Sequence, residues 1–180
     1  MSSMDFIRIA AACPLTNVAD IEFNLNNIKI CIDKALSKKS KLVVFPELSM
    51  TSYTCADLFE QQLLLEKSTE ALENLCDYSR DKDILIAVGA PLVFNYCLYN
   101  CAYIIFHGKV LGIVPKSYIP NYEEFYEKRW FTEGLHIIDE RVDLHFQKDI
   151  PFGVNLIFTC GKFKFAFEIC EDLWAVIPPS

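Results

Sequence analysis

The sequence predicts an α/β fold, and three observations support this prediction. Short apolar runs typical of buried strands alternate with longer stretches in which apolar residues recur every three or four positions. The N-terminal elements follow one another as strand, helix and strand, the order of a βαβ unit. The chain of 180 residues is 52% apolar and 23% charged, a composition typical of one globular domain with a substantial core.

The N-terminal elements form the predicted βαβ unit. Residues 6–12 predict a first strand. Asp20 is the predicted N-cap of a helix that runs to about Ser37, because its apolar positions step by four and three and give one buried stripe. Residues 42–45 form a continuous apolar run, as expected of a parallel strand that is buried on both faces.

The next part of the chain predicts a second helix and a third buried strand. The helical stretch begins at Asp57, and we expect it to break near Ser68. A charged run at residues 80–83 ends it. Residues 84–88 then predict a short strand, since they are apolar and follow this polar boundary.

Two hairpins are predicted in the second half of the chain. The first joins residues 98–106 to residues 110–114 through a short turn that contains glycine. Residues 117–140 are rich in Tyr, Glu and Phe and predict an ordered excursion. The second hairpin pairs residues 156–159 with residues 163–169, whose alternating pattern predicts a strand with one buried face.

Composition argues against several classes of protein. The net charge of −7 and the lack of a basic stripe argue against nucleic-acid binding. No apolar stretch approaches the ~18 residues that span a bilayer, and no secretory signal is present, so we expect a cytoplasmic protein without membrane association. Its eight cysteines are then expected to be reduced. Cys97 and Cys101 lack a second Cys/His pair at zinc-binding spacing, so no metal site is expected.

Three reactive side chains, Glu47, Lys116 and Cys170, follow predicted strands within one or two residues. Open α/β sheets bind ligands beyond the carboxyl ends of their strands. A carboxylate can accept the proton of a thiol, and an ammonium can lower the thiol pKa and stabilise an oxyanion. Singly, the three could be a cap, an exposed hairpin end and a core thiol. We expect one acyl-transfer site, because three coincidences at strand ends are harder to explain.

The motifs around these residues resemble the nitrilase superfamily of carbon–nitrogen hydrolases. They are Phe45-Pro46-Glu47-Leu48, Pro115-Lys116 and Glu168-Ile169-Cys170-Glu171-Asp172. Further segments are similar to one branch, the glutaminase domain of glutamine-dependent NAD synthetase. These are Thr51-Ser52-Tyr53, Asp57-Leu58-Phe59, Ile119-Pro120-Asn121-Tyr122, Glu124-Phe125, Glu127, Arg129, Phe131 and Leu173-Trp174. The resemblance covers residues 6–180.

The resemblance implies an αββα sandwich of the nitrilase type, truncated at its C-terminal end because the family's domain continues well past the cysteine. Residues 1–180 are then expected to be an incomplete glutaminase domain, from a split gene, a larger protein or a degenerate copy. No cofactor is implied for this domain. ATP and magnesium are implied only for a synthetase domain that is absent here. The implied partners are glutamine, this synthetase domain and further copies of the chain in a homo-oligomer.

The resemblance also implies roles for the three reactive residues. Cys170 would be the nucleophile, Glu47 the general base and Lys116 the stabiliser of the oxyanion. The implied reaction is hydrolysis of glutamine through a thioester, which supplies ammonia for ATP-dependent amidation of deamido-NAD. Two alternatives stay open: a stand-alone amidase that acts on another small amide, and a non-catalytic fragment.

Three further residues match positions that line the glutamine pocket in that branch, namely Tyr53, Tyr122 and Glu171. Glu171 would face the α-ammonium of the substrate, whereas the two tyrosines could also be ordinary packing residues. A carboxylate beside a thiol raises its pKa, so we expect Lys116 to outweigh Glu171. Ser52 stands where the family usually has glycine, which predicts a differently shaped loop after Glu47.

Overall fold

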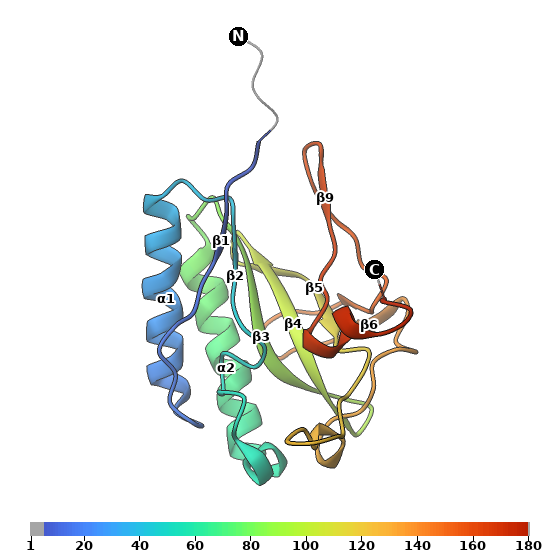
Figure 1. Cartoon of the computed structure of the whole chain (residues 1–180). Coiled ribbons are helices and arrows are strands. Elements are labelled where there is room, and N and C mark those ends of the chain that lie inside the picture. Colours follow the sequence, from blue (N-terminus) through green and yellow to red (C-terminus); the bar gives the residue numbers. More distant parts are fainter. Residues whose placement is uncertain (1–5, 180) are drawn as a thin grey trace.

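The computed structural model describes residues 6–179, and within them a seven-stranded mixed sheet forms the centre of the molecule (Figure 1). The strands are β1 (Ile9–Ala11), β2 (Leu42–Val44), β3 (Leu85–Phe94), β4 (Cys97–Phe106), β5 (Lys109–Pro115), β6 (Glu140–Val142), β7 (Ile150–Phe152), β8 (Phe158–Cys160) and β9 (Phe163–Phe165). The helices are α1 (Ile21–Ser37), α2 (Gln62–Ser79) and the short 3-10 helices η1 (Ala56–Glu60), η2 (Glu127–Arg129) and η3 (Cys170–Trp174). The predicted α/β class is confirmed.

The sheet order is β1-β2-β3-β4-β5-β7-β6, and α1 and α2 cover one of its faces. β1, β2 and β3 run parallel, as the predicted βαβ unit requires. Asp20 caps α1 as predicted, since its carboxylate accepts a hydrogen bond from the Phe23 amide at 3.1 Å. Ile28 and Ile32 of α1 are fully buried against the sheet. Each such side chain contributes about 1.5–3 kcal/mol to the stability of the fold.

The second helix differs from its prediction in two ways. α2 passes through Ser68 without a break, because this small side chain is fully buried within the apolar stripe that faces the sheet. Asp57 lies in the preceding η1 rather than in the helix. No helix of residues 6–179 is long and apolar enough to cross a membrane.

The third strand is twice as long as the sequence indicates and forms a hairpin with β4 that was not predicted. The sequence does not indicate that the strand continues, because it contains Gly89 and Pro91, and both residue types are rare within strands. Asn95 and Tyr96 form its turn with positive φ angles of 48° and 63°, as a two-residue hairpin turn requires. The predicted hairpin of β4 and β5 is confirmed, although it begins one residue earlier than expected.

The hairpin of β8 and β9 lies against the other face of the sheet (Figure 1). Its aromatic residues Phe158, Phe165 and Phe167 pack on a smaller apolar cluster of that face. The predicted strand over residues 163–169 is shorter than expected and ends at Phe165, because β8 offers only three residues to pair with. The layers of residues 6–179 are therefore helices, sheet and hairpin. β6 and β7, three residues each, were not predicted.

Candidate active site

The structure brings Glu47, Lys116 and Cys170 together. Glu47 follows β2, Lys116 directly follows β5, and Cys170 is the first residue of η3. Lys116 Nζ lies 2.6 Å from Glu47 Oε1, and the charge of the same carboxylate adds to burial in raising the pKa of the Cys170 thiol. Glu47 and Cys170 also line a cavity of about 100 Å³ between the sheet and the segment that precedes η3.

Close backbone packing against β3 places the segment that carries Glu47. The amide of Met50 donates to the Gly89 carbonyl at 3.0 Å. A Cβ atom on Gly89 would lie only 2.3 Å from the backbone nitrogen of Leu48. Glycine at this position therefore sets how deeply the Glu47 segment sits against the sheet.

Replacement of Gly89 by alanine is expected to push this segment outward, because the colliding atoms belong to the backbone and cannot rotate away. We expect a loss of about 1–3 kcal/mol in the free energy of unfolding. A displacement of ~1 Å at Glu47 would lower turnover on the order of 100-fold. Urea denaturation and amide hydrolysis rates measure the two effects. Wild-type values in both assays would show that the contact at Gly89 does not position Glu47.

A second carboxylate, Glu127, completes the environment of Lys116. Lys116 Nζ lies 2.8 and 2.9 Å from the two oxygens of Glu127, and the Tyr53 hydroxyl donates to Glu127 Oε1 at 2.7 Å. Lys116 is 0% exposed and Glu127 3% exposed. In the sequence Glu127 stands out only as part of a segment similar to the glutaminase branch, since nothing local distinguishes it from the exposed glutamates around it.

The ammonium of Lys116 thus forms ion pairs with two carboxylates, those of Glu47 and Glu127. Burial alone would lower the pKa of Lys116, but the charges and hydrogen bonds of Glu47 and Glu127 outweigh burial and raise it. Burial raises the pKa of Glu47, and the nearby charge of Glu127 raises it further, while Lys116 opposes both. Lys116 therefore stays protonated, and Glu47 is a stronger base than an ordinary carboxylate.

The pKa of the Cys170 thiol is raised, which corrects the expectation that Lys116 would lower it on balance. Partial burial of the thiol is the largest cause even though the residue as a whole is exposed, the charge of Glu47 adds to it, and Lys116 opposes them. The carboxylate beside the thiol is Glu47 rather than the sequence neighbour Glu171. Cys170 also has a positive φ of 50°, a strained conformation for a residue with a Cβ atom. The resting site accordingly holds a protonated thiol next to a base.

A buried carboxylate, Asp172, joins the segments that carry Lys116 and Cys170. It accepts hydrogen bonds from the amides of Ser117, Tyr118 and Ile169 at 3.0, 2.9 and 3.0 Å. Asp172 is 1% exposed, and burial raises its pKa despite these bonds. In the sequence Asp172 belongs to the motif around Cys170, but nothing there predicts its role. Its contacts fix the thiol relative to the end of β5.

The three predicted pocket residues lie around Cys170 but do not form one cluster. Tyr53 is bonded to Glu127, whereas the exposed Tyr122 donates to Glu171 at 2.9 Å. Burial is the largest cause that raises the pKa of Tyr53, and the bond to Glu171 is the largest for Tyr122; the charge of Cys170 adds to both shifts. Ser52 has φ of 72°, the left-handed conformation that glycine favours. This loop therefore keeps a backbone shape suited to glycine.

An exposed ion pair connects the two loops that contain Tyr53 and Glu127. Asp57 accepts hydrogen bonds from Arg129 Nε at 2.7 Å and from Trp130 Nε1 at 2.9 Å. These bonds lower the pKa of Asp57 to about 2. η1 and η2 are thereby joined beside the site.

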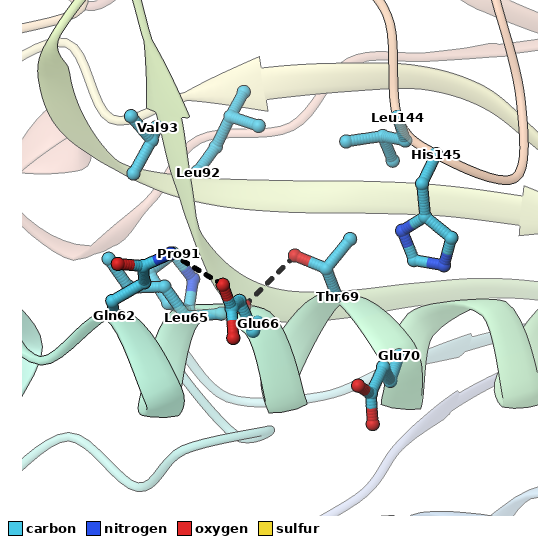
Figure 2. A pocket seen from close by; sticks show the side chains of 10 residues that line it. All are labelled: Gln62, Leu65, Glu66, Thr69, Glu70, Pro91, Leu92, Val93, Leu144 and His145. Atoms are coloured by element: carbon cyan, nitrogen blue, oxygen red, sulfur yellow. Dashed lines mark hydrogen bonds between the residues drawn. The ribbon is translucent and has the colours of Figure 1, made fainter.

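A larger groove of about 460 Å³ lies elsewhere, between α2 and the end of β3. Figure 2 shows that Gln62 in this groove is already hydrogen-bonded to Glu66, at 2.6 Å. Among the described residues, none that the sequence predicts for the site lines this groove. The candidate site is therefore the smaller cavity beside Cys170.

Comparisons with known proteins give consistent results. The carbon-nitrogen hydrolase family matches residues 9–176. A glutamine-dependent NAD(+) synthetase of Mycobacterium tuberculosis is 36% identical over 179 residues, which cover 97% of this chain and 26% of that protein. The crystal structure of a glutamine-dependent NAD(+) synthetase from Cytophaga hutchinsonii superposes with a TM-score of 0.84 at 30% identity, over 92% of this chain and 28% of that one. A Nesterenkonia amidase of the nitrilase superfamily gives a TM-score of 0.73 at 18% identity, over 94% and 57%, which shows likeness of fold. The chain thus spans about a quarter of the length of these NAD synthetases.

Proposed function

The chain belongs to the carbon–nitrogen hydrolase family and has the nitrilase-type fold, and we propose that it hydrolyses the side-chain amide of glutamine through a thioester on Cys170. One observation carries the proposal: a thiol, a base of raised pKa and a buried ammonium meet beside one cavity. The names of the relatives support glutamine as the substrate. No step requires a cofactor.

In the first half of the proposed reaction, Cys170 Sγ attacks the amide carbonyl carbon while the thiol proton passes to Glu47. The carbonyl oxygen becomes an oxyanion, which the ammonium of Lys116 stabilises. When the tetrahedral intermediate collapses, the carbon–nitrogen bond breaks and the leaving nitrogen takes the proton from Glu47. Ammonia leaves, and a γ-glutamyl thioester remains on Cys170. The thiolate need not exist at rest, which suits the raised pKa of Cys170.

In the second half, water attacks the thioester carbonyl and transfers a proton to Glu47. The carbon–sulfur bond breaks, the sulfur of Cys170 regains the proton, and glutamate leaves. Glu47 thus accepts and returns one proton in each half. Glu127 would act through Lys116, because it holds the ammonium with two hydrogen bonds.

Selection of glutamine is proposed to come from Tyr53, Tyr122 and Glu171. The Glu171 carboxylate accepts a bond from Tyr122 near the thiol and carries the charge that an α-ammonium needs. For the whole protein, we propose that the released ammonia amidates deamido-NAD in a domain that uses ATP and magnesium. A homo-oligomer and a cytoplasmic location, where the thiol stays reduced, complete this proposal.

Replacement of Glu47 by glutamine tests the proposed role of the base. The variant should lose about 10²–10⁴-fold in glutamine hydrolysis, because no group accepts the thiol proton. Iodoacetamide should still alkylate Cys170, since the thiol remains. Ammonia release and mass spectrometry measure the two reactions.

The same substitution at the exposed Glu22 of α1 is the matched control and should leave both reactions unchanged. Full glutamine hydrolysis by Glu47→Gln would contradict the role of Glu47. Preference for another small amide in a substrate screen would contradict glutamine as the substrate.

A further inference from the structure

Asn100 is a buried polar residue in the middle of the apolar strand β4. It is 1% exposed and pairs with Pro91 of β3 on one side. On the other side its carbonyl accepts a hydrogen bond from the Lys116 amide at 2.8 Å. Asn100 therefore belongs to the rigid centre of the sheet and adjoins the end of β5. The mechanism above gives it no role.

The side chain of Asn100 points its amide nitrogen at the proposed base. Asn100 Nδ2 donates to Glu47 Oε1 at 2.5 Å. Its Oδ1 atom is buried and has no hydrogen-bond partner within residues 6–179. A buried carbonyl without a partner is destabilising, and native proteins keep few such groups. The bond to Glu47 gives a reason to keep an asparagine here, because the opposite orientation would place two oxygens together.

We propose that Asn100 is a positioning residue for Glu47, and that with Lys116 it holds Oε1 so that Oε2 faces the thiol of Cys170. Both Asn100 and Lys116 donate to the same oxygen, Oε1. The other oxygen then remains for the proton that the thiol gives up. The catalytic part of this inference rests on the proposed function, whereas the positioning of the Glu47 carboxylate by Asn100 does not.

The charges around Glu47 make this neutral donor important. Lys116 is the one cation bonded to Glu47 within residues 6–179, and it also serves Glu127. Burial and the charge of Glu127 both disfavour an ionised Glu47. The nearby thiol of Cys170, whose pKa is raised, stays protonated and adds no charge. Tyr53, bonded to Glu127, stays neutral and adds no charge. The hydrogen bond from Asn100 favours the ionised carboxylate, which is the form that accepts a proton.

Two substitutions test the inference in the intact protein. Asn100→Leu removes the donor and retains an apolar side chain of similar size. Asn100→Asp retains the shape but places a second carboxylate against Glu47. Both should raise the midpoint of Glu47 ionisation by about one pH unit or more. The acidic limb of the kcat profile should move upward by the same amount, with KM little changed.

The matched control is Asn24→Leu, because Asn24 is the other buried asparagine of residues 6–179 and does not contact Glu47. Its side chain makes three hydrogen bonds, with Asn17 and with the Met50 carbonyl. Asn24→Leu should lower the melting temperature without moving the ionisation of Glu47. Asn100→Leu should instead move the ionisation of Glu47 without lowering the melting temperature, since the substitution also removes an unpartnered carbonyl. A purely structural role for Asn100 would produce the pattern of the control.

The decisive readout is the titration of Glu47 by carbon-13 NMR in glutamate-labelled protein, with Glu47→Gln identifying the signal. It needs no substrate, so it separates two failures. If wild-type protein hydrolyses glutamine but the midpoint of Glu47 ionisation is unchanged in Asn100→Leu and Asn100→Asp, the inference about Asn100 is overturned and the proposed function stands. If the midpoint moves but wild-type protein does not hydrolyse glutamine, the proposed function fails and the hold on Glu47 stands. Should Asn100→Leu not fold, Asn100→Asp decides.

Discussion

Replacement of Cys170 by alanine is expected to abolish glutamine hydrolysis in the intact protein, with a loss on the order of 10⁴-fold or more in kcat. The reason is that the thioester cannot form without the sulfur, and no neighbouring group within residues 6–179 can replace it as a nucleophile in this geometry. Ammonia release from glutamine measures the effect. A synthetase reaction supplied with free ammonia should survive, because it would use a separate site.

Cys160→Ala is the matched control for this substitution. Cys160 is also exposed and ends β8, ten residues before Cys170. We expect it to retain full hydrolysis. Turnover by Cys170→Ala near the wild-type rate would contradict the assignment of the nucleophile, as would a large loss in Cys160→Ala.

Replacement of Lys116 by methionine should have the second-largest effect, on both stability and activity. It leaves the carboxylates of Glu47 and Glu127 without the buried ammonium that both contact. Loss of one member of a buried ion pair typically costs about 3–5 kcal/mol in the free energy of unfolding. Glutamine hydrolysis should also be lost, because the oxyanion has no cation. Lys41→Met, which removes an exposed ion pair with Asp83, is the control and should cost at most about 1 kcal/mol.

The destabilisation of Lys116→Met should depend on pH with a definite sign. Without the ammonium, the pKa of Glu47 in the folded state, which burial already raises, moves further above the unfolded value of about 4.3. The folded variant then binds more protons than the unfolded chain, so its stability falls as pH rises. Urea denaturation between pH 4 and 8 should show a gap from wild type that widens with pH. A gap that narrows with rising pH would contradict the burial of two carboxylates on Lys116.

The Lys116→Met variant also tests whether Lys116 lies close enough to Cys170 to influence the pKa of its thiol. Lys116 lowers the pKa of Cys170 even though burial and Glu47 prevail. The alkylation profile of Cys170 should therefore move to higher pH in Lys116→Met. An unchanged profile would mean that the two side chains are not neighbours.

Residues with a local signature were predictable from the sequence. Asp20 precedes an apolar stripe of period 3.6 and caps α1 as expected. Glu47 and Lys116 could be predicted because each follows closely after an apolar run that forms a strand. Cys170 was found by the same reasoning, although its strand ends at Phe165 and the residue opens η3 instead.

Residues whose importance comes from distant partners could not be found in this way. Asn100 contacts Glu47 across 53 positions, and Asp172 reaches Ser117 across 55. In the sequence, Asn100 is one polar residue in an apolar strand and Glu127 is one acid in a polar loop. Only folding shows that Lys116 is buried and needs a second carboxylate.

The errors in the elements have a similar origin. Ser68 weakens a helical pattern locally, but packing against the sheet keeps α2 continuous. Gly89 suggests the end of a strand, whereas it is required where the Glu47 segment approaches β3. Tertiary packing overrides local preference in both cases.

The proposed reaction requires that glutamine becomes covalently bound to Cys170 during turnover. Intact protein quenched in acid during turnover, then digested and mapped by mass spectrometry, tests it most directly. We predict a mass increase equal to glutamine minus ammonia, confined to the peptide that contains Cys170 and absent from Cys170→Ala. A glutamyl adduct on another cysteine, or one that persists in Cys170→Ala, would contradict the account.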